Sequence, residues 1–287
     1  MRKFPEYVIE KLIFASGIAS IVFVVLILLF LLKEGLSLFV HVNPVSFIAG
    51  RNWYPISEPP QFGILPLILG SLFVTFGAIV IAVPLGLASA VYVAEVAPQW
   101  LKEVLKSGIE LLAAIPSIVL GFIGIVTLAP FLKNAFNLPS GLTALAGSIM
   151  LAFMAMPTIV SIIEDAINSV PKSYKEGSLA LGATRFQTIY RVTIPAASSG
   201  ILAAIMLGIG RVIGETMAVL MITGNAAVMP TSLLQPVRTL TATIAAEMGE
   251  AVSGSDHYYA LFAIGIVLFA ISFMINLVAD RFLHKKQ

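Results

Sequence analysis

The stretch that decides the fold runs from Asn168 to Pro195 and reads NSVPKSYKEGSLALGATRFQTIYRVTIP. It is polar and mixed in charge, yet it lies between two apolar segments that are each long enough to cross a bilayer. A connection between two neighbouring elements usually has only about 4–6 residues. Because this connection is longer and has a helical pattern, we expect it to contact another molecule.

The chain as a whole has the composition of an integral membrane protein. Of its 287 residues, 59% are hydrophobic and 11% are charged, whereas soluble domains carry about 25% charged residues. The net charge of +2 is too small to indicate a nucleic-acid partner. The chain has no cysteine and its three histidines are far apart in the sequence, so we expect no disulfide and no metal site.

Apolar runs predict an all-α integral membrane protein with six transmembrane helices in contact with lipid. The six expected spans are Leu12–Leu32, Leu65–Ala94, Ile109–Leu132, Leu142–Ile163, Ala197–Thr223 and His257–Val278. Before the last span, the sequence RTLTATIAAEMGEA is too polar to cross the membrane and predicts a short interfacial or re-entrant helix. We therefore divide the chain into a first span with its extracytoplasmic loop (residues 1–64), a transmembrane core (65–280) that contains the polar stretch 168–195, and a tail (281–287).

The basic residues predict the orientation in the membrane. With the N-terminus in the cytoplasm, twelve Lys and Arg residues lie on the cytoplasmic side, four lie on the other side, and Arg211 lies within a span. Membrane proteins carry an excess of basic residues in their cytoplasmic loops. We therefore expect both termini, the tail and the polar stretch to be cytoplasmic.

The polar stretch resembles the EAA coupling motif of ABC-importer permeases. That motif has a glutamate, two small residues, a glycine six positions after the glutamate, and a proline at its end. The matching residues here are Glu176, Gly177, Ser178, Gly182 and Pro195, with Gly177 and Ser178 in place of the usual alanines. In that family the loop forms a short helix that docks in a cleft of a cytoplasmic ATPase.

Physical reasons support this interpretation of the stretch. Small residues permit the close approach of a second backbone, Gly182 permits a turn at a helix end, and Pro195 suits the start of the next helix. The alternative is a solvated loop that has a helix-forming composition and contacts nothing.

Three further stretches, residues 52–98, 210–225 and 238–251, resemble phosphate-importer permeases of the PstC type. The resemblance implies a MetI-like ABC-permease architecture in the cell inner membrane and a role as the permease subunit of an ATP-driven phosphate importer. The implied partners are a second homologous permease subunit in a heterodimer, a cytoplasmic ATPase dimer that binds ATP and magnesium, and an extracytoplasmic phosphate-binding protein. The sequence contains no G-x-x-x-x-G-K-[ST] motif, so we expect no cofactor and no enzymatic activity in this chain.

Arg211 and Glu215 are the candidate residues of the substrate path. They lie near the centre of the fifth expected span, where an arginine costs at least about 2.5–3.5 kcal/mol. Their i, i+4 spacing predicts one helical face, shared with the small residues Ala204, Gly208, Gly214 and Ala218. One interpretation is a structural ion pair that serves helix packing. The other is a translocation site, in which Arg211 attracts an oxyanion and Glu215 holds the guanidinium in place.

The resemblance favours a translocation site, because in phosphate permeases an arginine and a glutamate at these motif positions matter for transport. One arginine cannot balance a divalent anion, so we expect the partner permease to supply a second one. Glu215 can accept the proton of hydrogen phosphate but repels sulfate, which has no proton to donate. The pair therefore predicts selectivity for phosphate over sulfate.

Arg238, Glu247 and Glu250 lie on the expected extracytoplasmic side. They are candidates for a gate or for a contact with the binding protein. The alternative is that the two acids are solvated and that Arg238 pairs with them.

Two other functions stay open at this stage. The first is a permease for another oxyanion, such as sulfate or molybdate. The second is a secondary transporter or a channel that works without ATP, which would need inverted repeats that the sequence does not show.

Overall fold

The computed structural model describes the backbone of residues 3–284 and the side chains of residues 8–278 and Arg281. Arg2, Lys285 and Lys286, three of the basic residues expected in the cytoplasm, lie outside the described residues. Within the described part, five helical stretches are long and apolar enough to cross a membrane, namely Val8–Val40, Leu65–Val96, Ser117–Ala135, Ala144–Asn168 and Asp256–Val278. A sixth is complete when the bent pair Arg185–Ala196 and Ser198–Ile213 counts as one span. On that count the predicted helical membrane protein with six spans is confirmed, with one short antiparallel β-pair in addition.

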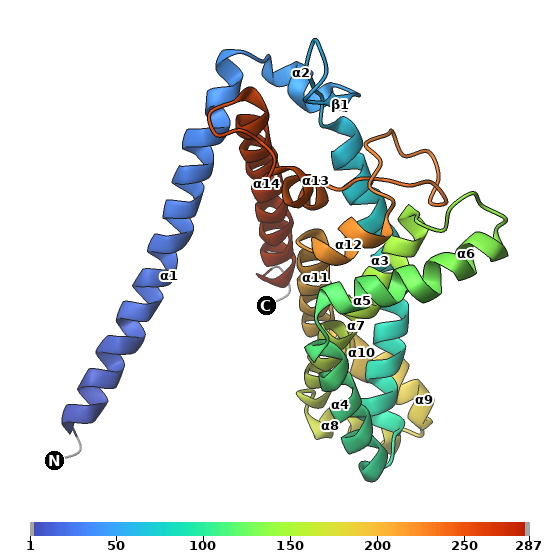
Figure 1. The fold of residues 1–287 in the computed structure, drawn as a ribbon. Helices are drawn as coiled ribbons and strands as arrows, with labels where there is room; N and C mark the ends of the chain where they lie inside the picture. Colours follow the sequence, from blue (N-terminus) through green and yellow to red (C-terminus); the bar gives the residue numbers. More distant parts are fainter. Residues whose placement is uncertain (1–2, 285–287) are drawn as a thin grey trace.

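The elements follow the order drawn in Figure 1. The first half of the chain contains α1 (Lys3–Ser37), a 3₁₀ turn (Leu38–Val40), α2 (Pro44–Ala49), β1 (Trp53–Tyr54), β2 (Gln61–Phe62), α3 (Leu65–Val91), α4 (Gln99–Ala114), α5 (Ser117–Ile123) and α6 (Ala129–Ala135). The second half contains α7 (Ala144–Asn168), α8 (Lys172–Ala180), α9 (Arg185–Thr188), α10 (Ile194–Ala196), α11 (Ser198–Ile213), α12 (Met217–Ile222), α13 (Leu240–Glu247) and α14 (Asp256–His284). Three π-helical turns, Tyr92–Val96, Gly124–Leu128 and Ile189–Thr193, continue α3, α5 and α9.

The core of the bundle is the pair α3 and α7, which pack more extensively than any other pair of described elements. Small residues lie at this contact. Gly77 faces Ser148, and Gly86 faces Ile159, so closely that a Cβ atom on either glycine would clash. Ser148 Oγ also donates to the carbonyl of Val74 at 3.1 Å. Close backbone approach of this kind stabilises helix pairs in a membrane, where lipid tails compete for every apolar surface.

A second hydrophobic cluster closes the end of the bundle that is uppermost in Figure 1. We call the end of α1, α2, β1, β2 and the start of α14 the cap; in the same cluster they pack against Ile64 and Leu67 at the start of α3 and against Leu240 of α13. Its largest buried side chains include Phe47, Trp53 and Leu261, and Trp53 faces Phe62 across the antiparallel β1–β2 pair. In contrast, the N-terminal half of α1 extends away from the other helices (Figure 1).

The third expected span, Ile109–Leu132, begins too early. In the structure α4 ends at Ala114, and Ile115 is extended with ψ of 125°. Pro116 follows, and a proline disfavours the helical conformation of the residue before it. The third span therefore begins at Ser117 and ends at Ala135, whereas α4 is a separate amphipathic helix.

The fifth expected span, Ala197–Thr223, is not one helix. α11 covers Ser198–Ile213, and the chain leaves the helical path before α12 begins at Met217. Pro195 lies in the first turn of the short α10, as expected for a helix start. The second helix of the bent pair, α11, begins at Ser198, after a bend of 68°. The predicted short helix before the last span is confirmed as α13.

Candidate translocation site and coupling surface

The break between α11 and α12 forms the candidate translocation site. The backbone N–H of Gly214 donates to the carbonyl of Gly210 at 3.2 Å and closes α11. Glu215 then turns its carboxylate onto the start of α12. Its Oε1 accepts hydrogen bonds from the backbone N–H groups of Thr216, Met217 and Ala218 at 3.0, 3.1 and 3.4 Å. A carboxylate is favourable there because the first N–H groups of a helix have no partner within the helix.

Arg211 lies on the last turn of α11 and its side chain is exposed. Its Nη1 donates to Thr158 Oγ1 at 3.3 Å. Thr158 belongs to α7 and directly follows Pro157, which lies inside that helix. Sequence reasoning did not predict the contribution of Thr158, because no local pattern joins residues 53 positions apart.

The expected ion pair on one helical face is therefore wrong for this state of the molecule. Within the described part of the chain, no salt bridge joins Arg211 to Glu215. The i, i+4 argument requires a continuous helix, and this helix ends at Ile213. Ala204 and Gly208 are buried on α11 as the pattern implies, but Gly214 and Ala218 lie beyond the helix end, so the proposed face does not exist.

A small cavity with both hydroxyl and apolar side chains lies beside the break. Ser71 and Thr75 of α3, together with Thr239 and Thr241 of the segment that begins α13, line a cavity of about 10 Å³ beside Glu215. Thr241 Oγ1 donates to the carbonyl of Glu215 at 2.8 Å. A cavity of this size has room for about one water molecule. The break thus places a carboxylate, a backbone carbonyl and several hydroxyl groups next to apolar side chains of the bundle.

Glu247, at the end of α13, is the centre of a second polar cluster. Its carboxylate accepts from Arg238 Nη1 and from Trp53 Nε1, the latter at 3.0 and 3.2 Å, and contacts His257 Nε2 at 2.9 Å. We call these four side chains the cap cluster. Only 16% of the Glu247 side chain is exposed, so Glu247 is not a solvated acid, whereas Glu250 is exposed. Sequence reasoning paired Arg238 with the acids but missed Trp53 and His257.

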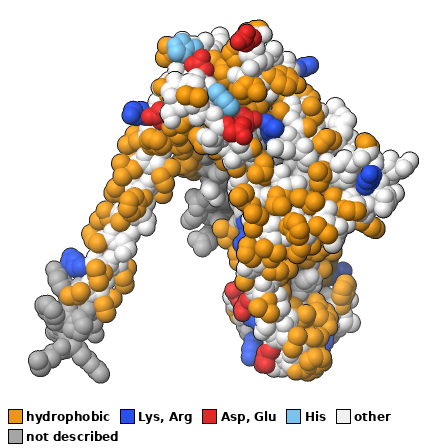
Figure 2. Space-filling view, in the orientation of Figure 1, with side chains coloured by type: hydrophobic (Ala, Val, Ile, Leu, Met, Phe, Trp, Pro, Cys, Tyr) orange, Lys and Arg blue, Asp and Glu red, His pale blue; other side chains and the backbone are white. Residues whose placement is uncertain are grey.

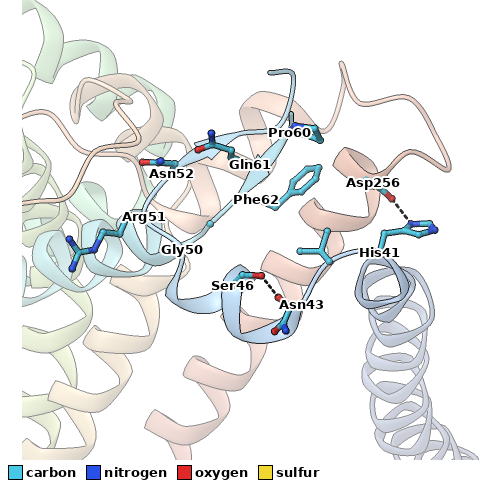
Figure 3. A pocket seen from close by; sticks show the side chains of 12 residues that line it. His41, Asn43, Ser46, Gly50, Arg51, Asn52, Pro60, Gln61, Phe62 and Asp256 are labelled. Carbon is cyan, nitrogen blue, oxygen red and sulfur yellow. Dashed lines mark hydrogen bonds and ion pairs between the residues drawn. The ribbon is translucent and has the colours of Figure 1, made fainter. Parts of the chain in front are cut away.

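A polar cavity of about 500 Å³ lies on the cap (Figure 3). Its lining includes His41, Asn43, Arg51, Gln61 and Asp256. His41 Nδ1 contacts Asp256 Oδ1 at 2.9 Å and so ties the end of α1 to the start of α14. The next residue, His257, belongs to the cap cluster. The cavity and the cap cluster therefore share the start of α14.

The expected coupling helix is present as α8, Lys172–Ala180. Gly182 has φ of +84° and ends it with the turn that its sequence position predicts. Glu176 is exposed, and an added Cβ atom on Gly177 would meet no other atom within 4 Å. Ser178 Oγ lies 3.0 Å from Thr188 Oγ1, so it joins α8 to α9. The contact of this surface with an ATPase stays a prediction.

Large side chains stand exposed beside α8. Leu181 is 90% exposed, Phe186 is 77% exposed, and Tyr190 is 66% exposed. A groove of about 510 Å³ runs between Lys175, Arg185 and Phe186. Figure 2 shows acidic and basic side chains next to hydrophobic ones at this end of the molecule. Such a surface, with both apolar and charged groups available, is typical of a contact between proteins.

One buried carboxylate fastens the amphipathic helix α4 to the core. Glu164 of α7 is 5% exposed, and its Oε1 contacts Lys106 Nζ at 3.0 Å and accepts from Asn168 Nδ2 at 3.1 Å. The hydrogen bond to Glu164 raises the pKa of Lys106 above its ordinary value of 10.5. This ion pair connects α4 to the helix that carries Thr158.

These features define a class of protein. A helical bundle with six candidate spans carries a broken helix with an exposed arginine at the break, and an exposed short helix at one end. That combination is typical of the membrane subunit of a transporter.

Comparison with known proteins identifies the family. Residues 82–286 match the family described as "Binding-protein-dependent transport system inner membrane component", and the chain belongs to this family. It is 42% identical over 288 residues to the "Probable ABC transporter permease protein YqgH" of Bacillus subtilis (strain 168), covering 100% of this chain and 93% of that protein. It is 38% identical to the "Phosphate transport system permease protein PstC" of Mesorhizobium japonicum, covering 84% of this chain and 78% of that protein.

A solved structure supports the fold. The crystal structure of a bacterial alginate ABC transporter, in complex with an alginate pentasaccharide-bound periplasmic protein, contains a chain that matches with a TM-score of 0.66. The match covers 98% of this chain and 96% of that chain at 15% identity, so it shows the fold alone. By its family match and its relatives, the chain is a multi-pass membrane permease of the ABC-importer type, and these relatives are transport permeases rather than enzymes.

Proposed function

We propose that this chain is one transmembrane subunit of an ATP-driven phosphate importer in the cell inner membrane. The single observation that carries the proposal is the state of Arg211. Its guanidinium is exposed at a break in a membrane helix, and its only hydrogen bond within the described residues goes to the neutral hydroxyl of Thr158. An arginine that no carboxylate neutralises is available to an anion.

The chemistry of guanidinium favours phosphate. It offers planar, paired N–H donors that match two oxygens of the anion, which a point-like ammonium does not. One positive charge does not balance a divalent anion, so the second permease subunit of a heterodimer supplies a further cation. Relatives named phosphate transport system permease PstC support this choice of cargo.

Energy enters through α8. An ATPase dimer in the cytoplasm holds ATP and magnesium and hydrolyses ATP, while this chain transmits the movement. The exposed Glu176, the open space at Gly177 and the neighbouring apolar side chains support α8 as the docking surface. Both termini and α8 are then cytoplasmic. The cap faces the other side, where a phosphate-binding protein delivers the substrate.

Competition in proteoliposomes tests the cargo. The complex of this chain, its ATPase, the second permease and the binding protein takes up labelled phosphate while sulfate or molybdate is added in excess. We expect uptake to persist with both competitors. Loss of phosphate uptake with molybdate or sulfate would assign the permease to another oxyanion. Equal uptake without the ATPase would indicate a secondary transporter or a channel.

A further inference from the structure

The segment 237–247, which contains Arg238 and α13, contacts both ends of α12. After α12, the N–H of Val237 donates to the carbonyl of Thr223 at 2.9 Å, and Arg238 Nε donates to the carbonyl of Asn225 at 3.0 Å. Before α12, Thr241 Oγ1 donates to the carbonyl of Glu215 at 2.8 Å. The segment therefore holds the short helix whose first N–H groups bind the Glu215 carboxylate.

The contact before α12 has a fixed direction. A threonine hydroxyl has one proton, and Thr241 gives it to Glu215. Its 3.1 Å contact with Thr239 Oγ1 must therefore use the proton of Thr239. Thr239 in turn accepts from the N–H of Ala242 at 3.2 Å. Both threonines are buried, at 4% and 6% exposure, so loss of the Thr241 hydroxyl leaves two polar groups without their partners.

The other end of α13 is held by the cap. Glu247 binds Arg238, the Trp53 indole of β1 and the His257 imidazole of α14. Arg238 thus contacts Glu247 through Nη1 and the loop after α12 through Nε. α13 itself has eight residues, a length of about 12 Å. A helix this short is stiff, so a displacement of one end reaches the other, against the hydrogen bond that the N–H of Leu240 donates to Ser71 Oγ of α3 at 2.9 Å.

We infer that α13 and Arg238 form a clamp that couples the position of the cap to the position of the Glu215 carboxylate. Thr241 and Arg238 are positioning residues, because they act on the backbone on either side of α12. When the cap shifts against the bundle, α12 and the carboxylate at its start shift with it. The consequence for transport rests on the proposed role of Glu215 in the substrate path, but the coupling itself does not.

The absence of cysteine from this chain permits a direct test. A Met217→Cys reporter stands at the first residue of α12, where the native side chain is 44% exposed. A Lys133→Cys reporter on the exposed end of α6 lies outside the clamp. The rate of alkylation by a maleimide is measured for each reporter in the assembled complex, with Glu247→Gln present or absent. The measurement is repeated in Thr241→Val and Thr241→Ser backgrounds.

We expect Glu247→Gln to change the alkylation rate at position 217 by about threefold or more in the parent, within the range for coupled residues. In the Thr241→Val background the same change is expected to have less than about half that effect, because the hydroxyl that links α13 to Glu215 is gone. Thr241→Ser keeps the hydroxyl and restores the full effect, and the Lys133→Cys reporter does not respond.

Any of three results would overturn the clamp. Glu247→Gln could leave the alkylation rate at position 217 unchanged, or it could change that rate equally in the parent and Thr241→Val backgrounds. It could also change the alkylation rate of the Lys133→Cys reporter as much as that at position 217. None of these measurements depends on cargo. A permease that transports no phosphate and still shows the expected alkylation pattern would refute the proposed function and leave the clamp intact.

Discussion

Replacing Glu215 by glutamine separates the capping of α12, which the structure shows, from the selection of the anion, which we propose. In the structure one carboxylate oxygen accepts three backbone N–H groups at the start of α12. Glutamine keeps an oxygen that can accept there, but it loses the charge. Hydrogen bonds to charged groups contribute about 1.5–3 kcal/mol and those to neutral groups about 1 kcal/mol. We therefore expect Glu215→Gln to destabilise the break by about 1 kcal/mol and Glu215→Ala by about 2 kcal/mol, the loss of a whole cap.

Heating the purified complex checks this order. The temperature at which half of the complex aggregates is expected to fall from the parent to Glu215→Gln, and further to Glu215→Ala. Glu215→Asp is the matched control, because it keeps a charged carboxylate that can cap the helix, and its temperature is expected to stay closest to that of the parent. An unchanged temperature for Glu215→Ala would refute the capping role.

The same variants measure selectivity. The second carboxylate oxygen can accept the proton of hydrogen phosphate, whereas the amide of glutamine can donate to sulfate. One such charged hydrogen bond corresponds to a change of about tenfold or more. We therefore expect sulfate to compete with labelled phosphate uptake about tenfold better in Glu215→Gln than in the parent. An unchanged competition, in a variant that still transports, would show that Glu215 does not select the anion.

Three further perturbations test other parts of the molecule. At equal levels of the protein in the membrane, Arg211→Gln is expected to lower phosphate uptake about a hundredfold and Arg211→Lys about tenfold, because paired hydrogen bonds to the anion are lost. Near-normal uptake in Arg211→Gln would leave Arg211 a structural role only. Gly177→Trp is expected to fold normally, since the space around Gly177 is open, but to lose co-purification with the ATPase, whereas Gly177→Ala keeps it; equal co-purification of both would exclude docking at α8. Lys106→Met leaves the carboxylate of Glu164 buried without its cation and is expected to destabilise the protein by about 2 kcal/mol. This free energy is smaller than the loss for a fully buried ion pair, because Lys106 is half exposed. A second change, Glu164→Gln, is expected to restore stability. Because the pKa of Lys106 is raised, the stabilisation by the Lys106–Glu164 pair is complete at pH values below 10.5, the ordinary pKa of lysine, and is lost as the pH rises through the raised pKa. Heating the protein at several alkaline pH values measures this loss. A Lys106→Met variant with the same pH dependence as the parent would contradict it.

The sequence predicts the parts of this structure that local patterns determine. Long apolar runs predict the membrane helices, because a bilayer requires helical spans of that length. Gly182 predicts the turn that ends α8, since its φ of +84° suits glycine. Pro116 also indicates the end of α4, but the predicted third span, Ile109–Leu132, runs through this proline.

Contacts between distant segments do not follow from local patterns in the sequence. Glu247 meets Trp53 across 194 positions of the chain, and Arg211 meets Thr158 across 53. The helical repeat of 3.6 residues relates only residues that are close in the sequence, so it does not predict these contacts. The helical face assigned to Arg211 and Glu215 failed for a related reason, because the break after Ile213 is stabilised by the capping carboxylate of Glu215 itself. The residues of the candidate site can be proposed from the sequence by type, whereas their geometry depends on tertiary packing.

The measurement that tests the central claim most directly is the initial rate of labelled phosphate uptake into proteoliposomes that contain the complete complex, with and without ATP on the side of the ATPase. The proposed function predicts uptake that requires ATP, requires the binding protein, and is lost in Arg211→Gln. Phosphate uptake at the same rate without ATP, or ATP-driven uptake that Arg211→Gln leaves unchanged, would contradict it.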